Sequence, residues 1–192
     1  MARGVDRVFR FGGRLYVPCN TARLAAGPFL CTSANSVEQH LEVPPEFLLY
    51  RHLDARLDRV GLAAGWVHGD SMIDRGIFDG DIAIFQRYDF DYLQHGKIAV
   101  IERIGEEEGF GAWALKRLVI KRPRSSHQNR YGDEVAWNDP EIVLYSYNPR
   151  VPPNRLDQTG QYRVHGIFLR SIRRHNVTLV ESDVIRRLAG EE

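Results

Sequence analysis

Ser71 is a residue whose type and sequence setting could support covalent chemistry. It lies in the run GDSM, where an apolar stretch gives way to a glycine-rich turn. A serine hydroxyl becomes a nucleophile only when a nearby base takes its proton. No serine lies in the Gly-x-Ser-x-Gly motif of the α/β hydrolases. Because serine is also a common turn or capping residue, the turn alone leaves both roles open.

A histidine base or a metal is not indicated near this serine. If the preceding strand continues, its alternation places His68 on the opposite face from Ser71. His68 and Asp70 form a His-x-Asp pair without a third ligand nearby. Cys19 and Cys31 lack C-x-x-C spacing, so we expect reduced thiols rather than a zinc site or a disulfide. The sequence therefore predicts no metal and no cofactor.

Lysine is the remaining type of base, and only three of the 26 basic residues are lysines. In AWALKRLVI, strand alternation gives Lys116 a face made of Ala114, Leu118 and Ile120. Burial among apolar groups penalises the ammonium and lowers a lysine pKa, which makes the amine a base near neutral pH. Lys97 and Lys121 lie beside polar turns, where we expect them to stay solvated. A lysine in a strand can also extend its amine to water, so Lys116 could be structural.

Composition limits the kind of protein that positions these two residues. The chain has 192 residues, 43% hydrophobic and 27% charged, with a formal net charge of +1. This is the balance of one globular domain. No apolar run approaches the roughly 18 residues of a membrane span, and the start does not resemble a secretory signal. We therefore expect a cytoplasmic protein.

Short apolar runs separated by polar turns predict a mostly β fold, either a sandwich or a partly open barrel. The prolines and apolar spacing of Pro44 to Val60 predict a short amphipathic helix. Residues 1–40 show no sustained period and predict an extended arm, with at most a short strand at Arg14 to Pro18; residues 41–192 then form the main domain. The expected strands are Leu62 to His68, Asp81 to Arg87, Lys97 to Arg103, Trp113 to Ile120, Ile142 to Tyr147, Tyr162 to Ile172 and Val177 to Glu181.

Several of these segments occur together in the order seen in one known family. GDSMIDRGIFDGDIAIF, HGKIAVI, ALKRL, SYNP and YRVHGIFL resemble the self-cleaving peptidase domain of LexA, UmuD and the phage repressors. The resemblance implies a LexA/signal-peptidase-like β fold. It also implies Ser71 as nucleophile and Lys116 as general base, the lysine that the strand pattern selects independently. The backbone N–H groups of Ser71 and Met72 are the expected oxyanion donors.

Members of this family cut their own chain upstream of the serine, usually at Ala-Gly or Cys-Gly. Here LAAGPFL resembles that region, with Ala26–Gly27 as the expected bond. A second LAAG, Leu62 to Gly65, lies too close to Ser71 to fold back onto it. Pro28 follows Gly27 directly, whereas the family usually has another residue first. Because proline fixes φ, we expect it to slow cleavage or to shift the bond.

The segment before the cut is too short for a helix-turn-helix, which favours a UmuD-like accessory subunit of a translesion polymerase in the SOS response to DNA damage. The implied partners are a RecA filament on single-stranded DNA, an error-prone polymerase subunit and a second copy of the chain in a homodimer. Two alternatives are a regulator without its DNA-binding part and a noncatalytic binding module of the same fold. Insertions at 105–111 and 121–141 depart from the UmuD pattern and leave the polymerase partner open.

Overall fold

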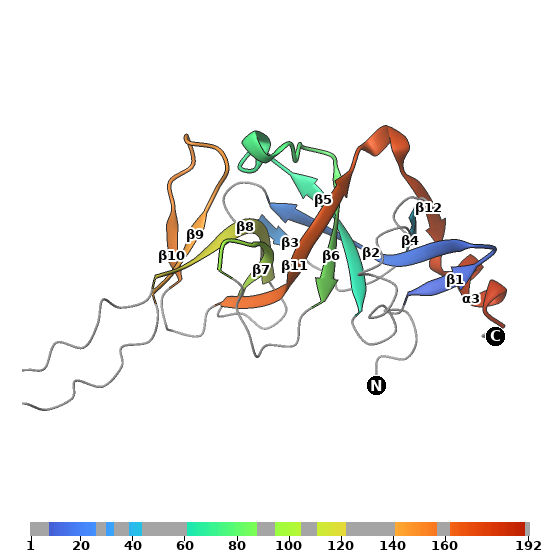
Figure 1. Ribbon diagram of the computed structural model, residues 1–192. Coiled ribbons are helices and arrows are strands. Elements are labelled where there is room, and N and C mark those ends of the chain that lie inside the picture. The colour runs from blue at the N-terminus through green and yellow to red at the C-terminus, as the bar shows by residue number, and fades with distance from the viewer. Residues whose placement is uncertain are drawn as a thin grey trace, which may run out of the picture.

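The computed structural model shows a mostly β protein (Figure 1). It describes residues 8–25, 30–32, 39–43, 61–87, 95–104, 111–121, 141–156 and 162–190. Within these ranges the strands are β1 (Phe9–Phe11), β2 (Arg14–Ala25), β3 (Leu30–Thr32), β4 (Gln39–Val43), β5 (Leu62–His68), β6 (Ile82–Arg87), β7 (Ile98–Ile104), β8 (Gly111–Lys121), β9 (Glu141–Tyr145), β10 (Asn154–Leu156), β11 (Tyr162–Ile172) and β12 (Thr178–Glu181). Two 3₁₀ turns, η1 (Ile73–Arg75) and η2 (Arg174–Asn176), and helix α3 (Ser182–Leu188) complete the described elements.

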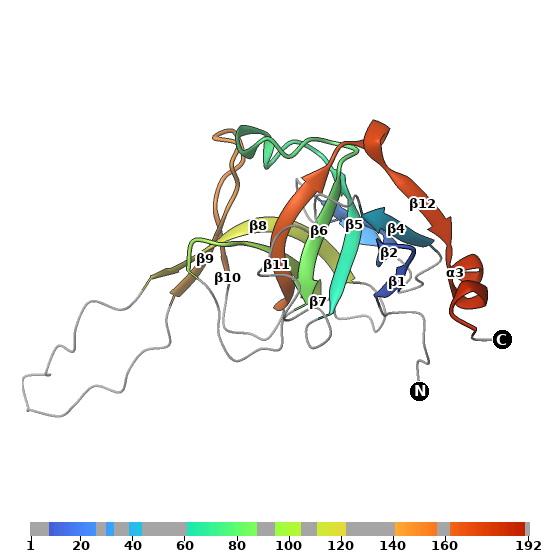
Figure 2. The ribbon, with the colours of Figure 1, turned by 45° about the vertical axis from the view of Figure 1, so that its right-hand side comes forward.

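The strands form one twisted sheet in the order β10-β9-β8-β7-β11-β6-β5-β2-β4-β12. In Figure 2, β5, β6 and β11 run side by side while β8 crosses at a steep angle to them. β2 also pairs with β8, in parallel, through Ala25 and Ala114. This contact closes a ring of β8, β7, β11, β6, β5 and β2 at one end. The expected mostly β fold is therefore confirmed, and its form is a partly open barrel.

The buried hydrophobic side chains form three main core clusters. The first joins β2, β4, β5 and β6, and the third joins β7, β8, β9 and β11. The second lies between them and packs the turn after β5 against β7 and β8. Its fully or nearly fully buried members include Met72, Ile77, Val100 and Leu115. The turn that holds Ser71 is therefore fixed by the core on its inner side.

Most of the expected strands are confirmed, and two of them, β5 and β11, have the bounds that the apolar patterns predict. The short strands β3, β4 and β10 and the C-terminal helix α3 were not expected. In α3, Ile185 is fully buried while Leu188 is exposed, so only a narrow apolar face marks this helix in the sequence. The helix predicted at Pro44 to Val60 lies outside the described residues, as do residues 105–110 and 122–140 of the two insertions.

The extended arm is the expectation that differs from the structure. Residues 9–25 form β1 and β2, which pair in an antiparallel hairpin. Gly12 and Gly13 have φ of 55° and 76°, as a two-residue hairpin turn with left-handed residues requires. Leu15 and Val17 are buried in the core, so β2 is part of the sheet. The run FGGRLYV held this signal, because a Gly-Gly pair between apolar residues is a hairpin signature.

Gly166 offers a test of how tightly the sheet is packed beside the site. An added Cβ would overlap the Gln86 carbonyl oxygen and lie 2.7 Å from the Phe85 ring. Both neighbours belong to β6, which pairs directly with β11. We expect Gly166→Ala to lower the free energy of unfolding by about 1–3 kcal/mol, measured by chemical denaturation. The control Ser171→Ala on the same strand should change it by less than about 0.5 kcal/mol, and equal effects would contradict the close packing.

Candidate active site

Ser71 and Lys116, 45 positions apart in sequence, meet in the interior of the protein. The Lys116 Nζ atom donates a hydrogen bond to Ser71 Oγ over 3.1 Å. Ser71 is completely buried, and Lys116 is only 2% exposed. The GDSM turn and the apolar strand face indicated Ser71 and Lys116 independently, and the structure places the two side chains in contact.

Burial sets the protonation of Lys116. Desolvation lowers its pKa from 10.5 to about 8, and the negative charge of Asp70 opposes that shift. At this pKa a substantial fraction of the amine is neutral slightly above neutral pH. A neutral amine has a lone pair that can accept a proton from a hydroxyl in hydrogen-bond contact. The pair can therefore act as a serine nucleophile with a lysine base.

The strand register explains why the lysine points inward. Lys116 lies opposite Ala99 of β7, and the neighbouring pair joins Ala114 to Ile101. Ala99, Ile101 and Leu118 are all buried in the same cluster. The amine is therefore surrounded by apolar side chains along its stem, as the alternation of AWALKRLVI predicts.

A second hydroxyl also contacts the lysine. Lys116 Nζ donates to Ser146 Oγ over 3.0 Å. The last pairs of β8 with β9 join Leu118 to Leu144 and Arg117 to Tyr145, so the next position along each strand sets Lys116 opposite Ser146. Ser146 therefore comes from the end of β9, while Ser71 comes from the turn after β5. The amine lies between two hydroxyls that approach from different elements.

The turn that holds Ser71 begins where β5 ends. Gly69 has φ of 98°, a conformation that favours glycine, and it redirects the chain out of the strand. The N–H of Ile73 donates to the Asp70 carbonyl over 3.1 Å, which closes a tight turn around Ser71. Met72, next in the chain, is fully buried and anchors the turn in the core. This explains the GDSM sequence in terms of backbone geometry and packing.

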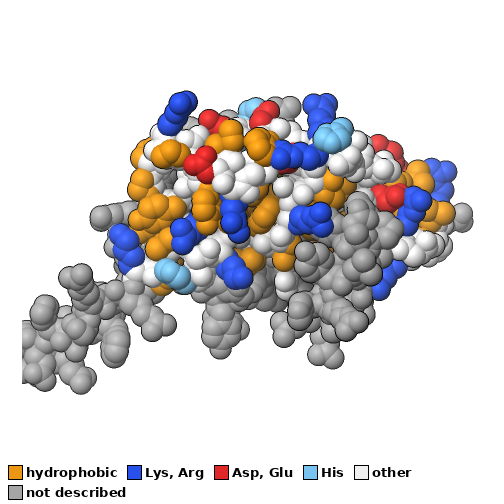
Figure 3. Space-filling model, turned by 45° about the horizontal axis from the view of Figure 1, so that its top comes forward, with side chains coloured by type: hydrophobic (Ala, Val, Ile, Leu, Met, Phe, Trp, Pro, Cys, Tyr) orange, Lys and Arg blue, Asp and Glu red, His pale blue; other side chains and the backbone are white. Residues whose placement is uncertain are grey.

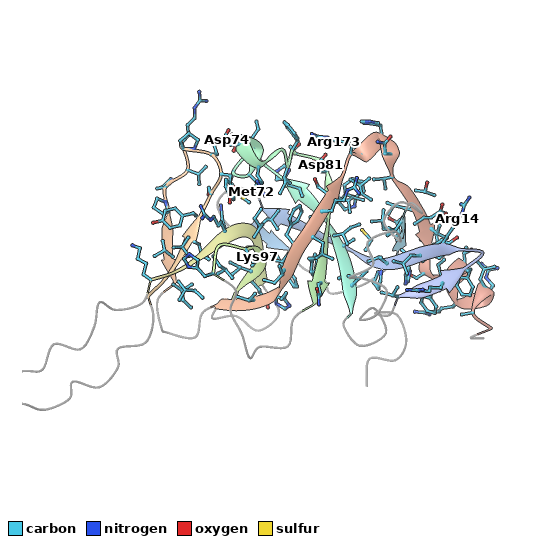
Figure 4. All side chains as sticks on the ribbon, viewed as in Figure 1. Arg14, Met72, Asp74, Asp81, Lys97 and Arg173 are labelled. Carbon is cyan, nitrogen blue, oxygen red and sulfur yellow. The ribbon has the colours of Figure 1, made fainter. Side chains whose placement is uncertain are left out.

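The D-G-D motif braces this turn from the side of β6. Asp79 Oδ1 accepts a hydrogen bond from the Gly69 N–H at 2.7 Å. Asp81 is almost fully buried, and its carboxylate accepts from the Phe78 N–H at 2.9 Å and forms an ion pair with Arg173 at 3.3 Å. Figure 4 shows Arg173 and Asp81 facing each other above the sheet. The Arg173 guanidinium also lies 3.8 Å from the centre of the Phe78 ring.

The segment after β9 holds the turn from the other side, and sequence reasoning assigned it no role. Asn148 is buried, and its Nδ2 donates to the Asp70 carbonyl over 3.3 Å. The Tyr147 carbonyl accepts from the Asp74 N–H at 3.0 Å. Ser146 and Asn148 thus belong to the candidate site, and the sequence analysis missed both. Their signal was the run SYNP, quoted only as part of the family pattern, because the β8–β9 register is needed to place it.

The other candidate residues, His68, Cys19 and the second LAAG motif, lie in settings that give them no part in this pair. His68 ends β5, is half exposed and pairs with Asp79 at 2.9 Å, away from the serine. Burial raises the pKa of the Cys19 thiol to about 12, so this thiol is unreactive at ordinary pH. Within the described ranges, no three His, Cys, Asp or Glu side chains cluster as metal ligands would. The second LAAG motif lies inside β5.

The expected scissile bond, Ala26–Gly27, lies outside the described residues, but its two flanks do not. On the amino side, Ala25 pairs with His68 of β5 and with Ala114 of β8. On the carboxyl side, Leu30 pairs with Trp113 of β8. Both flanks are therefore fixed on β8 at positions two and three residues before Lys116.

Fold and site together define a mostly β protein with a buried serine–lysine pair. Residues 18–123 match the family described as Peptidase S24-like, and this match covers more than half of the chain. The chain therefore belongs to that family, in agreement with the predicted LexA/UmuD resemblance. No curated protein matches the sequence closely. The family match includes Ser71 and Lys116 and ends before Ser146 and Asn148.

The surface near the site is mixed in character. On the face shown in Figure 3, Lys and Arg side chains of the described residues are scattered between apolar ones. Ile73 and Phe78, on the turn after Ser71, are 41% and 37% exposed. Of the helices in the described ranges, none has the length and apolar character needed to span a membrane.

The buried lysine predicts a specific pH dependence of stability. Because its folded-state pKa is near 8 and its ordinary value is 10.5, burial of the ammonium is fully penalised below pH 8. The penalty is relieved as pH rises from about 8 to 10.5. At pH 7 we expect Lys116→Met to have a higher free energy of unfolding than the parent. Between pH 7 and pH 10.5 the parent should gain up to about 3 kcal/mol, so the difference between the two proteins should shrink by that amount.

Both proteins in this comparison should contain Ser71→Ala, which removes any change in chain length during denaturation at alkaline pH. Lys97→Met in the same background is the matched control, because Lys97 is exposed. The measurement is urea unfolding at several pH values. If the stability difference between the parent and Lys116→Met stays constant from pH 7 to 10.5, then burial does not lower the pKa of Lys116.

Proposed function

We propose that this protein is a self-cleaving serine endopeptidase that cuts its own chain at Ala26–Gly27 with Ser71 as nucleophile and Lys116 as general base. The observation that supports this most strongly is the 3.1 Å contact between Lys116 Nζ and Ser71 Oγ, two side chains that are both buried. A lysine with a pKa near 8 matches the base that such a reaction needs. Membership of the Peptidase S24-like family agrees with this activity.

The reaction proceeds in two halves. Neutral Lys116 takes the Ser71 hydroxyl proton as Oγ bonds to the carbonyl carbon of Ala26. The tetrahedral intermediate then collapses: the bond from carbon to the Gly27 nitrogen breaks, and the Lys116 ammonium returns its proton to that nitrogen. Water, deprotonated by the same amine, attacks the ester between Ser71 and Ala26. The ester breaks, and Ser71 regains its proton from Lys116.

The developing oxyanion needs hydrogen-bond donors, and the turn offers two. In the part of the chain that the structure describes, the N–H groups of Ser71 and Met72 donate to no recorded acceptor. Free backbone N–H groups beside a nucleophile are the usual oxyanion donors, and one such donor lowers the activation barrier by about 2.7–4 kcal/mol. The described geometry therefore supports these two amides for that role.

The strand flanks support Ala26–Gly27 as the bond that is cut. A strand rises about 3.3 Å per residue, so Lys116 lies roughly 7 Å along β8 from the Ala114 position that pairs with Ala25. The chain then returns to β8 at Leu30, after four residues. A link anchored this closely on both sides needs little additional ordering to reach the serine.

A second function, a noncatalytic binding module of the same fold, is favoured by one observation. Ser71 is completely buried, as a purely structural serine would be. In this alternative the hydroxyls of Ser71 and Ser146 serve only to satisfy the buried amine. The two functions differ in a single property, whether the chain becomes shorter.

Incubation at increasing pH tests the activity without any partner. We expect the rate of self-cleavage to rise about tenfold per pH unit below pH 8 and to level off above it, because only neutral Lys116 is active. Intact mass and amino-terminal sequencing should give a product that begins at Gly27. Ser71→Ala and Lys116→Ala should leave the chain intact, with Lys97→Ala as the lysine control.

An unchanged mass after prolonged incubation at pH 10 would favour the noncatalytic module. Cleavage that survives Ser71→Ala would rule out the serine mechanism, and a product that begins elsewhere would move the scissile bond. We further propose, from the family resemblance, that RecA filaments on single-stranded DNA stimulate the cut in a UmuD-like role. Addition of RecA, ATP and single-stranded DNA at pH 7 should then speed cleavage of the wild type and leave Ser71→Ala unchanged.

Ser146 should act as a positioning residue for the lysine. Ser146→Ala removes a hydroxyl that accepts a hydrogen bond from Lys116 Nζ. Losing this acceptor disfavours the ammonium, so the midpoint of the pH profile should move to lower pH, while the plateau rate falls roughly tenfold. Ser146→Thr should restore most of the rate. The control Ser171→Ala should change neither quantity, and a Ser146→Ala profile identical to the wild type would exclude the role.

A further inference from the structure

We infer that residues 1–26, the amino-terminal piece produced by cleavage, stay bound to the rest of the protein through strand β2. The position of the cut rests on the proposed function, but the binding of the piece does not. The processed protein is then a two-chain complex, and the amino-terminal piece is not shed. β2 holds the piece through its position in the sheet and through the side chains that it buries.

β2 is an interior strand of the sheet, with a partner on each side. It pairs with β4 in antiparallel fashion and with β5 in parallel fashion. In the described sheet, β4 and β12 reach the remaining strands through β2. Figures 1 and 2 both show β2 between β5 and β4. Loss of residues 1–26 would therefore separate this end of the sheet from β5 and β6.

The side chains of β2 are also part of the core. Leu15, Val17 and Cys19 are at most 3% exposed and pack in the cluster that spans β2, β4, β5 and β6. Residues on the other side of the cut complete that cluster, among them Leu41, Val43, Leu62, Ile82 and Ile84. Dissociation would expose both sets to water at once. Because this burial does not depend on an intact bond at Ala26–Gly27, it keeps the piece in place.

Retention has a consequence for the active site. The last residue of β2, Ala25, pairs with β5 and β8 at the same time. Because Ser71 follows β5 and Lys116 lies on β8, we expect a peptide strand that approaches both residues to lie between these two strands. A retained β2 keeps this position occupied after the cut. The processed protein should therefore not cleave a second chain.

The test replaces self-cleavage with an external cut. In a Ser71→Ala chain, the recognition sequence of a site-specific protease is inserted between Ala26 and Gly27, and its folding is checked by near-ultraviolet circular dichroism. After cutting, we expect two pieces on a denaturing gel but one species, at the uncut position, in native size-exclusion chromatography. Separate elution of the small piece would overturn the inference. Because Ser71 is absent, neither result depends on the proposed activity.

Two variants in the same background show what holds the piece. Val17→Ala should speed dissociation of the piece at least about tenfold, because it removes buried apolar volume. Arg14→Ala breaks only the exposed ion pair with Glu42 and should change the rate no more than about fivefold. If the inserted sequence prevents folding, residues 1–26 with a tag are coexpressed with residues 27–192. Recovery of both by the tag supports retention, and soluble 27–192 without the tagged piece overturns it.

Discussion

The contact between a buried lysine amine and two serine hydroxyls sets the requirements that the surrounding elements meet. Burial disfavours an ammonium in this position, and among the described residues the charge of Asp70 favours it only in part, so the pKa of Lys116 falls toward neutral pH. The surrounding elements maintain that condition. β7 and β8 supply apolar neighbours along the stem, and the turn after β5 and the end of β9 supply a hydroxyl each. Burial thus sets the pKa of Lys116, and the hydrogen bonds to Ser71 and Ser146 fix the position of its amine.

The bracing around the nucleophile turn follows from the same requirement. A serine that must remain within 3.1 Å of an amine cannot lie on a loose loop, because small displacements break the contact. Asp79, Asp81 and Asn148 each bond to the backbone of this turn or of the segment after it, and Met72 fixes it in the core. The polar residues of the D-G-D motif are therefore best understood as supports for the turn.

How far the sequence predicts this arrangement depends on the range of the interactions involved. Lys116 and Ser71 could be found because their signals are local: a strand face and a turn sequence. Ser146 and Asn148 could not, because their positions depend on the pairing of β8 with β9 across an insertion. The integration of β2 was missed for a related reason. The Gly-Gly hairpin is a local signal, but the parallel pairing of β2 with β5 joins distant segments, and nothing in residues 14–25 alone specifies it.

The protonation of Lys116 decides whether its amine can act as a base, and the chain's composition makes it directly measurable. With only three lysines, a Ser71→Ala protein labelled at lysine should give three side-chain amine signals by nuclear magnetic resonance. We predict that one of these signals titrates with a midpoint near pH 8 and disappears in Lys116→Arg. If no lysine signal titrates below about pH 10, the amine is not desolvated as described, and Lys116 is not a base for Ser71 near neutral pH.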